Sequence, residues 1–427
     1  MRNASVHTAP VVVPIAGPPI ADGAVAVGDG LLVAVGTRDE VLAAHPAAEV
    51  TEWEGVMTPG LVNAHTHLQY TSFVEVGSVT HPTYVKWSER FVDEYENRRG
   101  EDWRATARQG VEEAIRSGTT CFADIVTDIE ALGVLVDEGV AGVSYFEIIG
   151  VDRPAWESRV EQRVTEALTS APRTTYSRIG LSPHAPYSID EPVLKEAAAL
   201  ARRLGVRLHV HLAESDTEDS YYRTGTGDLA DRVTLRVGRP WSLLARGGTG
   251  MGAAEFAESC GLLGPDSHMA HGVYLGRHGR HLLTAAGTYV ALCPRSNLVV
   301  GIDPPPVADF LAENAPFAVG TDSLGSNSSL DVMADVALLR RLAIDGGYDG
   351  PDLDRRLLEA ATMGGATALG LEAEVGTLEV GKRADLAILD VDPSLDRVER
   401  SLVEDGAGQC VGTIVGGEVR WQSRRFD

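Results

Sequence analysis

The chain has 427 residues, of which 44% are hydrophobic and 23% are charged, a composition that allows a large buried core and excludes a disordered or collagen-like chain. With 61 acidic and 37 basic residues its formal net charge is −24, so phosphate backbones and anionic lipids are repelled, and we expect no nucleic-acid partner. Every apolar run is shorter than the roughly 20 residues of a membrane span, and we therefore expect no membrane partner either.

The first sixty residues are predicted to form short β-strands. Apolar, β-branched runs at 11–17, 24–30 and 31–37 are separated by Gly, Pro and Asp turns. A short helix is expected within 35–50. We take residues 1–57 as the N-terminal part of a small β domain.

Helical and strand patterns alternate from about residue 105 onward. The amphipathic stretch 107–118 precedes the β-rich stretch 119–126, and the pair 191–205 and 206–214 repeats the arrangement. This alternation predicts a parallel sheet covered by helices, and about eight such units favour a closed barrel over an open sheet. No GxGxxG motif follows the first strand, which disfavours a dinucleotide-binding fold. We therefore predict an α/β fold with a (β/α)8 TIM-like barrel over residues 58–368.

The tail returns to β structure, at 378–392 and 412–421. β-rich segments thus bracket the barrel at both ends, and neither is large enough to bury a core alone. We expect them to pair into one small β-sandwich domain built from both termini, with residues 369–427 as its C-terminal part.

The four cysteines lie far apart and form no CxxC pair; they are Cys121, Cys260, Cys293 and Cys410. This spacing predicts reduced, buried thiols and disfavours a thiolate metal site. The first residues show no clear apolar region or cleavage site of a secretory signal. We therefore expect a cytoplasmic protein.

Two histidine pairs have the spacing of a metal site. His65 and His67 form an HTH motif after an apolar run, and alternate residues of a strand share a face, so both rings can point at one ion. His209 and His211 repeat the spacing in VRLHVHLAE. Because barrel sites lie at the C-terminal ends of strands, we take His211 as the ligand and His209, deeper in the barrel, as a core residue or a partner of a ligand.

Further polar residues fall at or just beyond predicted strand ends. They are His184 in LSPHAPYS, Glu214 in HLAES, His271 in SHMAHGVYL and Asp322 in GTDS. Singly, Asp322 could be a helix N-cap and Glu214 a solvated loop acid. In a barrel, however, the C-terminal ends of all strands open onto one face. Three imidazoles and one carboxylate suit Zn²⁺, and a carboxylate beside its bound water can move protons, so the pattern predicts metal-dependent hydrolysis.

Several motifs together resemble the amidohydrolase superfamily. The segment PGLVNAHTHLQY resembles its metal-binding first strand, and GTLEVGKRADLAILD its return into the small β domain. HVHLAE, AHGVYL, CPRSN and GTDS follow in the family's order, and the resemblance spans residues 20–420. Within the superfamily the chain resembles the aminohydrolase branch that includes methylthioadenosine/S-adenosylhomocysteine, guanine and aminodeoxyfutalosine deaminases and the triazine hydrolases.

This resemblance implies a hydrolase acting on carbon–nitrogen bonds other than peptide bonds. It would deaminate an aromatic amine on a purine, nucleoside or related heterocycle through metal-bound hydroxide, releasing ammonia. The cofactor would be one divalent metal, Zn²⁺ first, with Fe²⁺ or Mn²⁺ as alternatives, in a dimer or larger homo-oligomer. A hydrolase that removes chloride or an alkylamine from a triazine-like heterocycle is the alternative function. A catalytically silent scaffold relative is the third.

The resemblance also implies roles for single residues. The metal ligands would be His65, His67, His211 and Asp322. Glu214 would carry the proton from water to the ring nitrogen beside the reacting carbon and contact the substrate. Asp322 would also orient the hydroxide, His271 would hydrogen-bond the hydroxide or the tetrahedral intermediate, and His184 would contact the substrate.

Some positions depart from the family's patterns. Members of the superfamily that bind two metals bridge them with a lysine or a glutamate. No lysine occurs in 140–150 or 178–186, and Glu147 is the remaining candidate for a bridging residue. One metal is therefore favoured. The aminodeoxyfutalosine deaminases carry an HTHLE pattern, and this chain has Gln69 in place of its glutamate. In members that recognise adenosine, an acidic residue that follows a tryptophan holds the ribose hydroxyls. Here Trp87 is followed by four candidates for this role: Glu89, Asp93, Glu94 and Glu96. The aromatic residues Trp87, Phe91 and Tyr95, at helical spacing, are interpreted as packing residues.

Overall fold

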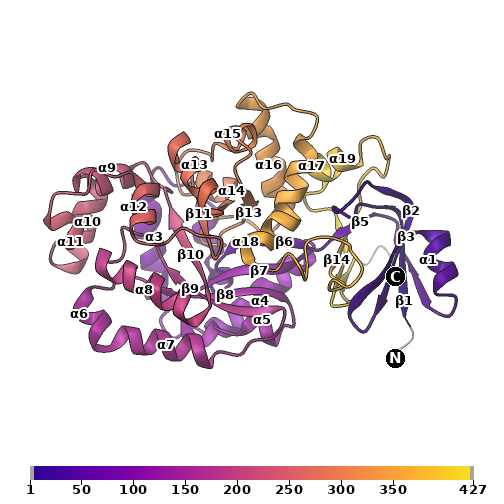
Figure 1. Cartoon of the computed structure of the whole chain (residues 1–427), viewed down its shortest axis with the longest axis horizontal. Helices are drawn as coiled ribbons and strands as arrows, with labels where there is room; N and C mark the ends of the chain where they lie inside the picture. Colours follow the sequence, from indigo (N-terminus) through magenta and orange to yellow (C-terminus); the bar gives the residue numbers. More distant parts are fainter. Residues whose placement is uncertain (1–3, 424–427) are drawn as a thin grey trace.

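The structure is a computed structural model that describes residues 4–423. Figure 1 shows a helix-covered barrel beside a smaller sheet, which is built from early and late parts of the chain. The barrel is an eight-stranded parallel sheet that closes almost completely, and the smaller body is a separate mixed sheet. The predicted (β/α)8 barrel with a small β domain from both termini is thus confirmed.

The barrel strands pair in chain order. They are β6 (Leu61–Thr66), β7 (Thr119–Val126), β8 (Ala141–Ile148), β9 (Ser177–Pro183), β10 (Arg207–Leu212), β11 (Ser267–His271), β12 (Tyr289–Leu292) and β13 (Phe317–Val319). The ring closes just beyond β13, where the Asp322 N–H donates to the His65 carbonyl at 2.9 Å and the Asn63 amide donates to the Thr321 hydroxyl at 2.7 Å. Closure therefore brings Asp322 beside His65.

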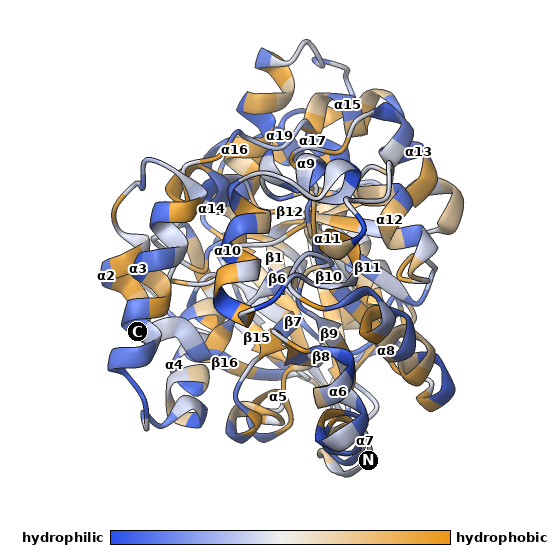
Figure 2. Cartoon of the chain, turned by 90° about the vertical axis from the view of Figure 1, so that its left-hand side faces the viewer, coloured by the Kyte–Doolittle hydropathy of each residue, from blue (hydrophilic) through white to orange (hydrophobic). Residues whose placement is uncertain are grey.

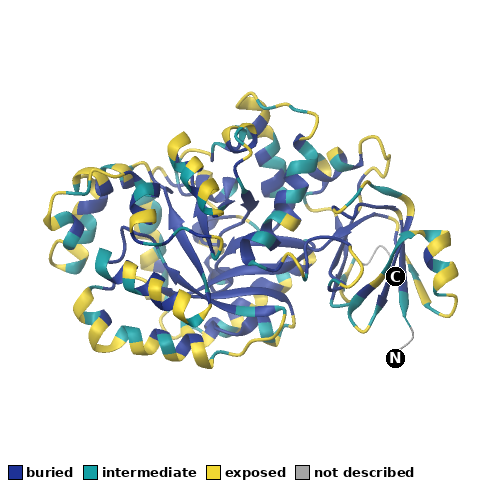
Figure 3. Cartoon of the chain, viewed as in Figure 1, coloured by how far each residue is buried: buried dark blue, intermediate teal, exposed yellow. Residues whose placement is uncertain are grey.

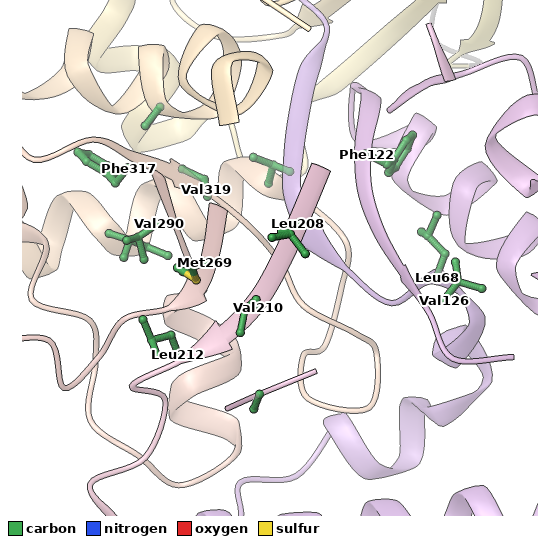
Figure 4. Packing of buried hydrophobic residues seen from close by; sticks show 14 of the residues in the cluster. Leu68, Phe122, Val126, Leu208, Val210, Leu212, Met269, Val290, Phe317 and Val319 are labelled. Carbon is green, nitrogen blue, oxygen red and sulfur yellow. The ribbon is translucent and has the colours of Figure 1, made fainter. Parts of the chain in front are cut away.

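Alternation along β10 decides which side chains enter the barrel. Leu208, Val210 and Leu212 belong to the large core between strands and helices, where Figure 4 shows them near Met269. Successive side chains of a strand point to opposite faces, so His209 and His211 face the barrel interior.

Helices cover the outside of the barrel, and Figure 3 shows their outer faces exposed and the strands buried. The longer ones are α4 (Trp103–Arg116), α7 (Glu161–Ser170), α8 (Glu191–Leu204), α13 (Arg277–Ala286), α16 (Val332–Asp345) and α19 (Val398–Asp405). Shorter ones are α5 (Val134–Asp137), α6 (Arg153–Ala155), α12 (Ala253–Ser259), α14 (Pro294–Val299), α15 (Val307–Ala312), α17 (Leu353–Glu359) and α18 (Gly365–Leu369). The chain between β7 and β8 forms no continuous helix, because Gly133 takes a left-handed φ of 101° between the short turn Ile129–Ala131 and α5.

Four helices lie over the C-terminal end of the barrel, away from the small sheet. They are α3 (Tyr84–Asn97), α9 (Thr217–Thr224), α10 (Asp228–Val237) and α11 (Ser242–Ala245). Figure 2 views the barrel from this end, with α10 and α11 in front of the strands. Within residues 4–423, no helix combines the length and the apolar character needed to cross a bilayer.

The small sheet has the strand order β16-β15-β14-β5-β1-β2-β3, with β4 paired to β1. Its strands are β1 (Ser5–Val12), β2 (Ile20–Gly28), β3 (Leu31–Thr37), β4 (Glu49–Glu52), β5 (Val56–Pro59), β14 (Leu386–Leu389), β15 (Cys410–Val415) and β16 (Glu418–Gln422). Buried Val25 and Met57 share a core with Ile388 and Ile414, so both parts of the chain are needed to form it. The domain boundaries at 57/58 and 368/369 stay predictions from the sequence.

Two local predictions at the start of the chain have different outcomes. The short helix expected within 35–50 is confirmed as α1 (Arg38–Ala44). The first strand lies earlier than predicted and ends at Val12. Pro14 lacks a backbone donor and Ile15 takes a left-handed φ of 64°, so the strand does not continue through 13–17.

Candidate active site

The polar residues predicted at strand ends gather at the C-terminal mouth of the barrel. His65 lies on β6 and His67 directly after it, His211 lies on β10, His271 ends β11, and Asp322 follows β13. One ligand atom each of His65, His67 and His211 lies within 4.8 Å of the others, and the same holds for His65, His271 and Asp322. The two sets share His65, so they form one cluster.

The distances within this cluster fit a single metal ion. Nε2 of His65 and Nε2 of His67 each lie 3.6 Å from Asp322 Oδ1. Nε2 of His67 lies 3.4 Å from Nε2 of His211. Nitrogen ligands at about 2.0–2.1 Å from a tetrahedral ion stand about 3.3 Å apart, so these spacings match a shared cation.

The hydrogen bonds of the rings leave nitrogen lone pairs for such a cation. His211 Nδ1 lies 2.8 Å from the His184 carbonyl, which can only accept, so Nδ1 carries the proton and Nε2 does not. His65 Nδ1 lies 3.1 Å from His209 Nε2, and the buried His65 Nε2 has no hydrogen-bond partner among residues 4–423. Orphaned buried nitrogens and outer partners of this kind are the usual surroundings of metal-binding histidines.

Asp322 is held in one orientation by its neighbours. Its Oδ2 accepts the hydroxyls of Ser296 and Ser326, both at 2.7 Å. Its Oδ1, which faces the histidines, accepts the Ser323 N–H at 2.8 Å. The residue takes a left-handed φ of 60°, and the next helix, α16, does not begin until Val332. The N-cap interpretation of Asp322 therefore does not apply.

Glu214 is a buried carboxyl group placed beside His271. Its Oε1 lies 3.7 Å from His271 Nε2, and the residue is 3% exposed, so it is not the solvated loop acid that its position in sequence allowed. Burial raises the pKa of Glu214 well above its usual range, and the charges of Asp322 and Glu218 add to this effect. A carboxyl group in this position can take up a proton and pass it on to a neighbouring atom.

Glu218 fixes the turn that carries Glu214, a role that the sequence alone did not reveal. Its carboxylate accepts three consecutive backbone N–H groups, those of residues 213, 214 and 215, at 2.9, 2.7 and 3.1 Å. Ala213 has a left-handed φ of 51°, so this turn is strained and needs support. The one signal in the sequence was an acid four residues after Glu214 in the first turn of α9.

His184 and the start of α3 border the same space. His184 is half-buried, and its Nδ1 lies 2.8 Å from the Ser188 hydroxyl. The Tyr84 and Tyr187 hydroxyls lie 2.9 Å apart and join α3 to the loop after β9. Arg232 of α10 donates to the Ser88 hydroxyl at 2.8 Å, so the helices over the mouth are tied to one another.

The acidic residues of α3 pair with basic side chains nearby in the chain or are exposed. Glu89 pairs with Lys86 at 2.8 Å, Glu94 pairs with Arg90 and Arg98, Glu96 pairs with Arg99, and Asp93 is exposed. The aromatic residues of this helix pack as predicted: the Phe91 ring lies 5.3 Å from Trp87 and 4.9 Å from Tyr70. The helix therefore supports the mouth of the barrel and offers no carboxylate to it.

Such a barrel, with clustered histidines and one aspartate at its mouth, defines a class of metal-dependent hydrolases. The pattern of the family described as the Amidohydrolase family matches residues 56–420. The chain therefore belongs to the amidohydrolase family, whose enzymes bind a metal, and it is a hydrolase acting on carbon–nitrogen bonds other than peptide bonds.

Known proteins of similar sequence and structure point the same way. The chain is 32% identical over 428 residues to a 5-methylthioadenosine/S-adenosylhomocysteine deaminase of Moorella thermoacetica, covering 95% of this chain and 90% of the relative. An adenosine deaminase structure from Xanthomonas campestris with bound zinc has a TM-score of 0.82 at 25% identity, covering 98% of this chain and 93% of that one. A triazine hydrolase from Arthobacter aurescens has a TM-score of 0.80 at 20% identity, covering 99% and 95%, and shares the fold.

Proposed function

We propose that this protein is a hydrolytic deaminase of a purine or nucleoside, which replaces an aromatic amine by an oxo group and releases ammonia. The observation that carries the proposal is the buried Glu214 carboxyl, set beside His271 next to the histidine–aspartate cluster. A group that can hold a proton there matches the need to protonate a ring nitrogen. The similarity to the Moorella enzyme, named for deamination of two adenine nucleosides, supports the substrate class.

His65, His67, His211 and Asp322 would hold one divalent metal, and Zn²⁺ is our choice. The set of three imidazoles and one carboxylate suits zinc, and the Xanthomonas neighbour carries zinc. Fe²⁺ and Mn²⁺ stay as alternatives. When bound, such an ion acidifies water so that it can attack at neutral pH.

The chain's own residues would then move protons and orient the reactants. Glu214 would take the proton that the attacking water gives up and pass it to the ring nitrogen beside the reacting carbon. The water oxygen adds to that carbon, the carbon–nitrogen bond to the amine breaks, and the amine leaves as ammonia with the remaining proton. Asp322 Oδ1 would orient the water, while His271 Nε2, which is buried and lies 3.7 Å from Glu214 Oε1, would donate a hydrogen bond to the oxygen that adds.

An ammonia-release screen tests the function. It compares adenine, guanine, their nucleosides, thioether nucleosides, aminodeoxyfutalosine and triazines, with the His211→Ala variant as the blank. We expect ammonia from a purine or nucleoside amine and none from the variant. Chloride or alkylamine release from triazines, without ammonia from any purine, would overturn the proposal in favour of the triazine hydrolase alternative.

We also propose that the protein is cytoplasmic and forms a homo-oligomer, a dimer or larger. Its small-molecule partner would be the heterocyclic substrate. The four cysteines are buried and unpaired, which suits a reducing compartment. The net charge of −24 disfavours nucleic acid as a partner. Size-exclusion chromatography with light scattering would measure the mass, and a monomer would contradict the assembly part of this proposal.

A further inference from the structure

Glu147 is a buried carboxylate of which only one oxygen is satisfied. It lies on β8, the third barrel strand, and is 7% exposed. Its Oε2 accepts the Thr127 hydroxyl at 2.7 Å. Its Oε1 is buried and has no hydrogen-bond partner among the residues that the structure describes. An unsatisfied buried oxygen is costly, so such a group calls for a ligand that completes it.

The side chain points into the space where the reaction would occur. Its neighbours Phe146 and Ile148 belong to the core outside the barrel, so Glu147 faces inward. One of its oxygens lies within 4.8 Å of a ring nitrogen of His184 and of one of His211. The carboxylate therefore stands beside a proposed metal ligand and beside the proposed substrate contact.

The direction of the free oxygen is fixed by a chain of hydrogen bonds. The Thr127 hydroxyl that binds Oε2 accepts in turn from the Tyr70 hydroxyl at 2.9 Å. The Thr127 N–H donates to the Gln69 side-chain oxygen at 2.9 Å, which anchors the loop after β7. Within residues 4–423, no lysine or arginine lies within salt-bridge distance of Glu147. The free oxygen is thus pre-organised and uncommitted.

The other acids near the mouth have tasks already. Glu214 and Asp322 belong to the reacting centre, Glu218 holds the turn of Glu214, and the α3 acids pair with surface cations or face solvent. Among these, Glu147 is the carboxylate left to recognise the part of the substrate that does not react.

We propose that Glu147 Oε1 accepts a hydrogen bond from an N–H or O–H donor of the bound substrate and so selects substrates that carry this donor. The inference rests on the proposed deaminase function and deepens it. The donor has two chemical sources, a hydroxyl of a nucleoside sugar or an N–H at the edge of the ring. A site built to satisfy one hydrogen bond rejects molecules that lack the donor, because the carboxylate then stays unpaired.

The test is a double-mutant cycle between protein and substrate. Glu147→Gln and Glu147→Ala are compared with the wild type on a substrate from the screen and on analogues that each lack one donor, such as 2′-deoxy, 3′-deoxy and ring-N-methyl forms. We expect kcat/KM to fall about 10- to 100-fold for the full substrate, with no further loss for the analogue lacking the matching donor. Coupling to a deoxy form assigns the sugar, and coupling to a ring-modified form assigns the ring edge.

Two controls separate substrate recognition by Glu147 from a metal-binding or purely structural role. The exposed Glu130→Gln change should leave all rates unchanged. Metal content, by elemental analysis, should stay the same in the Glu147 variants. A fall in metal content would make Glu147 a metal ligand, and an equal loss on every analogue would make it structural; either result overturns the inference.

Binding measurements distinguish the failure of this inference from failure of the proposed function. Calorimetric titration of the wild type and Glu147→Ala with unreactive purine nucleosides and their deoxy forms needs no turnover. If amines are deaminated but no analogue shows coupling, the role of Glu147 is refuted alone. If no amine is deaminated, the function fails, while coupling in the titrations would still support the contact.

Discussion

The small sheet and the barrel mouth each bury a histidine, and the difference between the two explains what makes a site. His7 on β1 is 3% exposed, and its Nδ1 accepts the Trp53 indole N–H at 3.2 Å. No second imidazole or carboxylate is paired with it in the described part of the chain. His65 is equally buried, yet ligand atoms of four other residues lie within 4.8 Å of its ring nitrogens. Burial alone therefore makes a core histidine; convergence of donor atoms makes a metal site.

The largest effect should come from the proton carrier of the mouth. Glu214→Gln keeps the shape of the side chain but removes the ionisable carboxyl group. Because the side chain can then no longer take up and release a proton, kcat should fall by about 10²–10⁴-fold. Metal content should be unchanged, and the exposed Asp216→Asn change serves as the control. Steady-state ammonia release measures both variants. Deamination by Glu214→Gln at close to the wild-type rate would remove this residue from the mechanism.

His209 sharpens the comparison, because it is a buried histidine that touches a proposed ligand without being one. His209→Ala removes the partner of His65 Nδ1 and should weaken metal binding by about 10- to 100-fold. Competition with a chelator measures the affinity, with the exposed His278→Ala as the matched control. An affinity equal to that of the wild type would show that the 3.1 Å contact does not support the metal site.

Glu218 is expected to have a smaller effect on the same reaction. A glutamine at this position can accept fewer of the three N–H groups, so the turn that holds Glu214 should loosen and kcat should fall about tenfold. Metal content and KM should change little, because neither the ligands nor the substrate contacts move. Unchanged kcat in Glu218→Gln would mean that the turn is rigid without this carboxylate.

The stability of the small sheet should depend on pH and not on metal. Burial lowers the pKa of His7 to about 4, below its ordinary value of 6.5, so the folded state favours the neutral ring. This stability is present above pH 6.5 and is lost as the pH falls toward 4, by at most about 3 kcal/mol. Urea unfolding of the wild type and His7→Gln between about pH 7.5 and 4.5 measures it. Parallel stability curves for the two proteins would contradict this role of His7.

The sequence revealed the parts of the site that lie along single strands. The HTH and HVH spacings and the GTDS turn mark strand ends, and the C-terminal strand ends meet in a barrel, so His65, His67, His211 and Asp322 could be placed at one mouth with His184 and His271. The choice of the four as ligands came from the family resemblance. Glu147 and Glu218 could not be placed in this way. Their importance comes from an unsatisfied oxygen and from three backbone contacts, and neither leaves a spacing pattern in the chain.

Local backbone events limited the prediction of the fold in a similar way. The alternation of patterns was sufficient for the barrel, and the strand over 119–126 was predicted to the residue. The break at Gly133 and the early end of β1 depend on left-handed backbone conformations at single residues, which hydrophobic periodicity does not encode.

The central claim is that four residues from three strand ends hold one divalent ion. An anomalous difference map from a crystal of the zinc-loaded protein, collected at the zinc edge, tests it directly. We expect one peak per chain within coordination distance of His65, His67, His211 and Asp322. A peak held instead by Glu147 and His184, or an ordered mouth with no peak at saturating zinc, would contradict the claim.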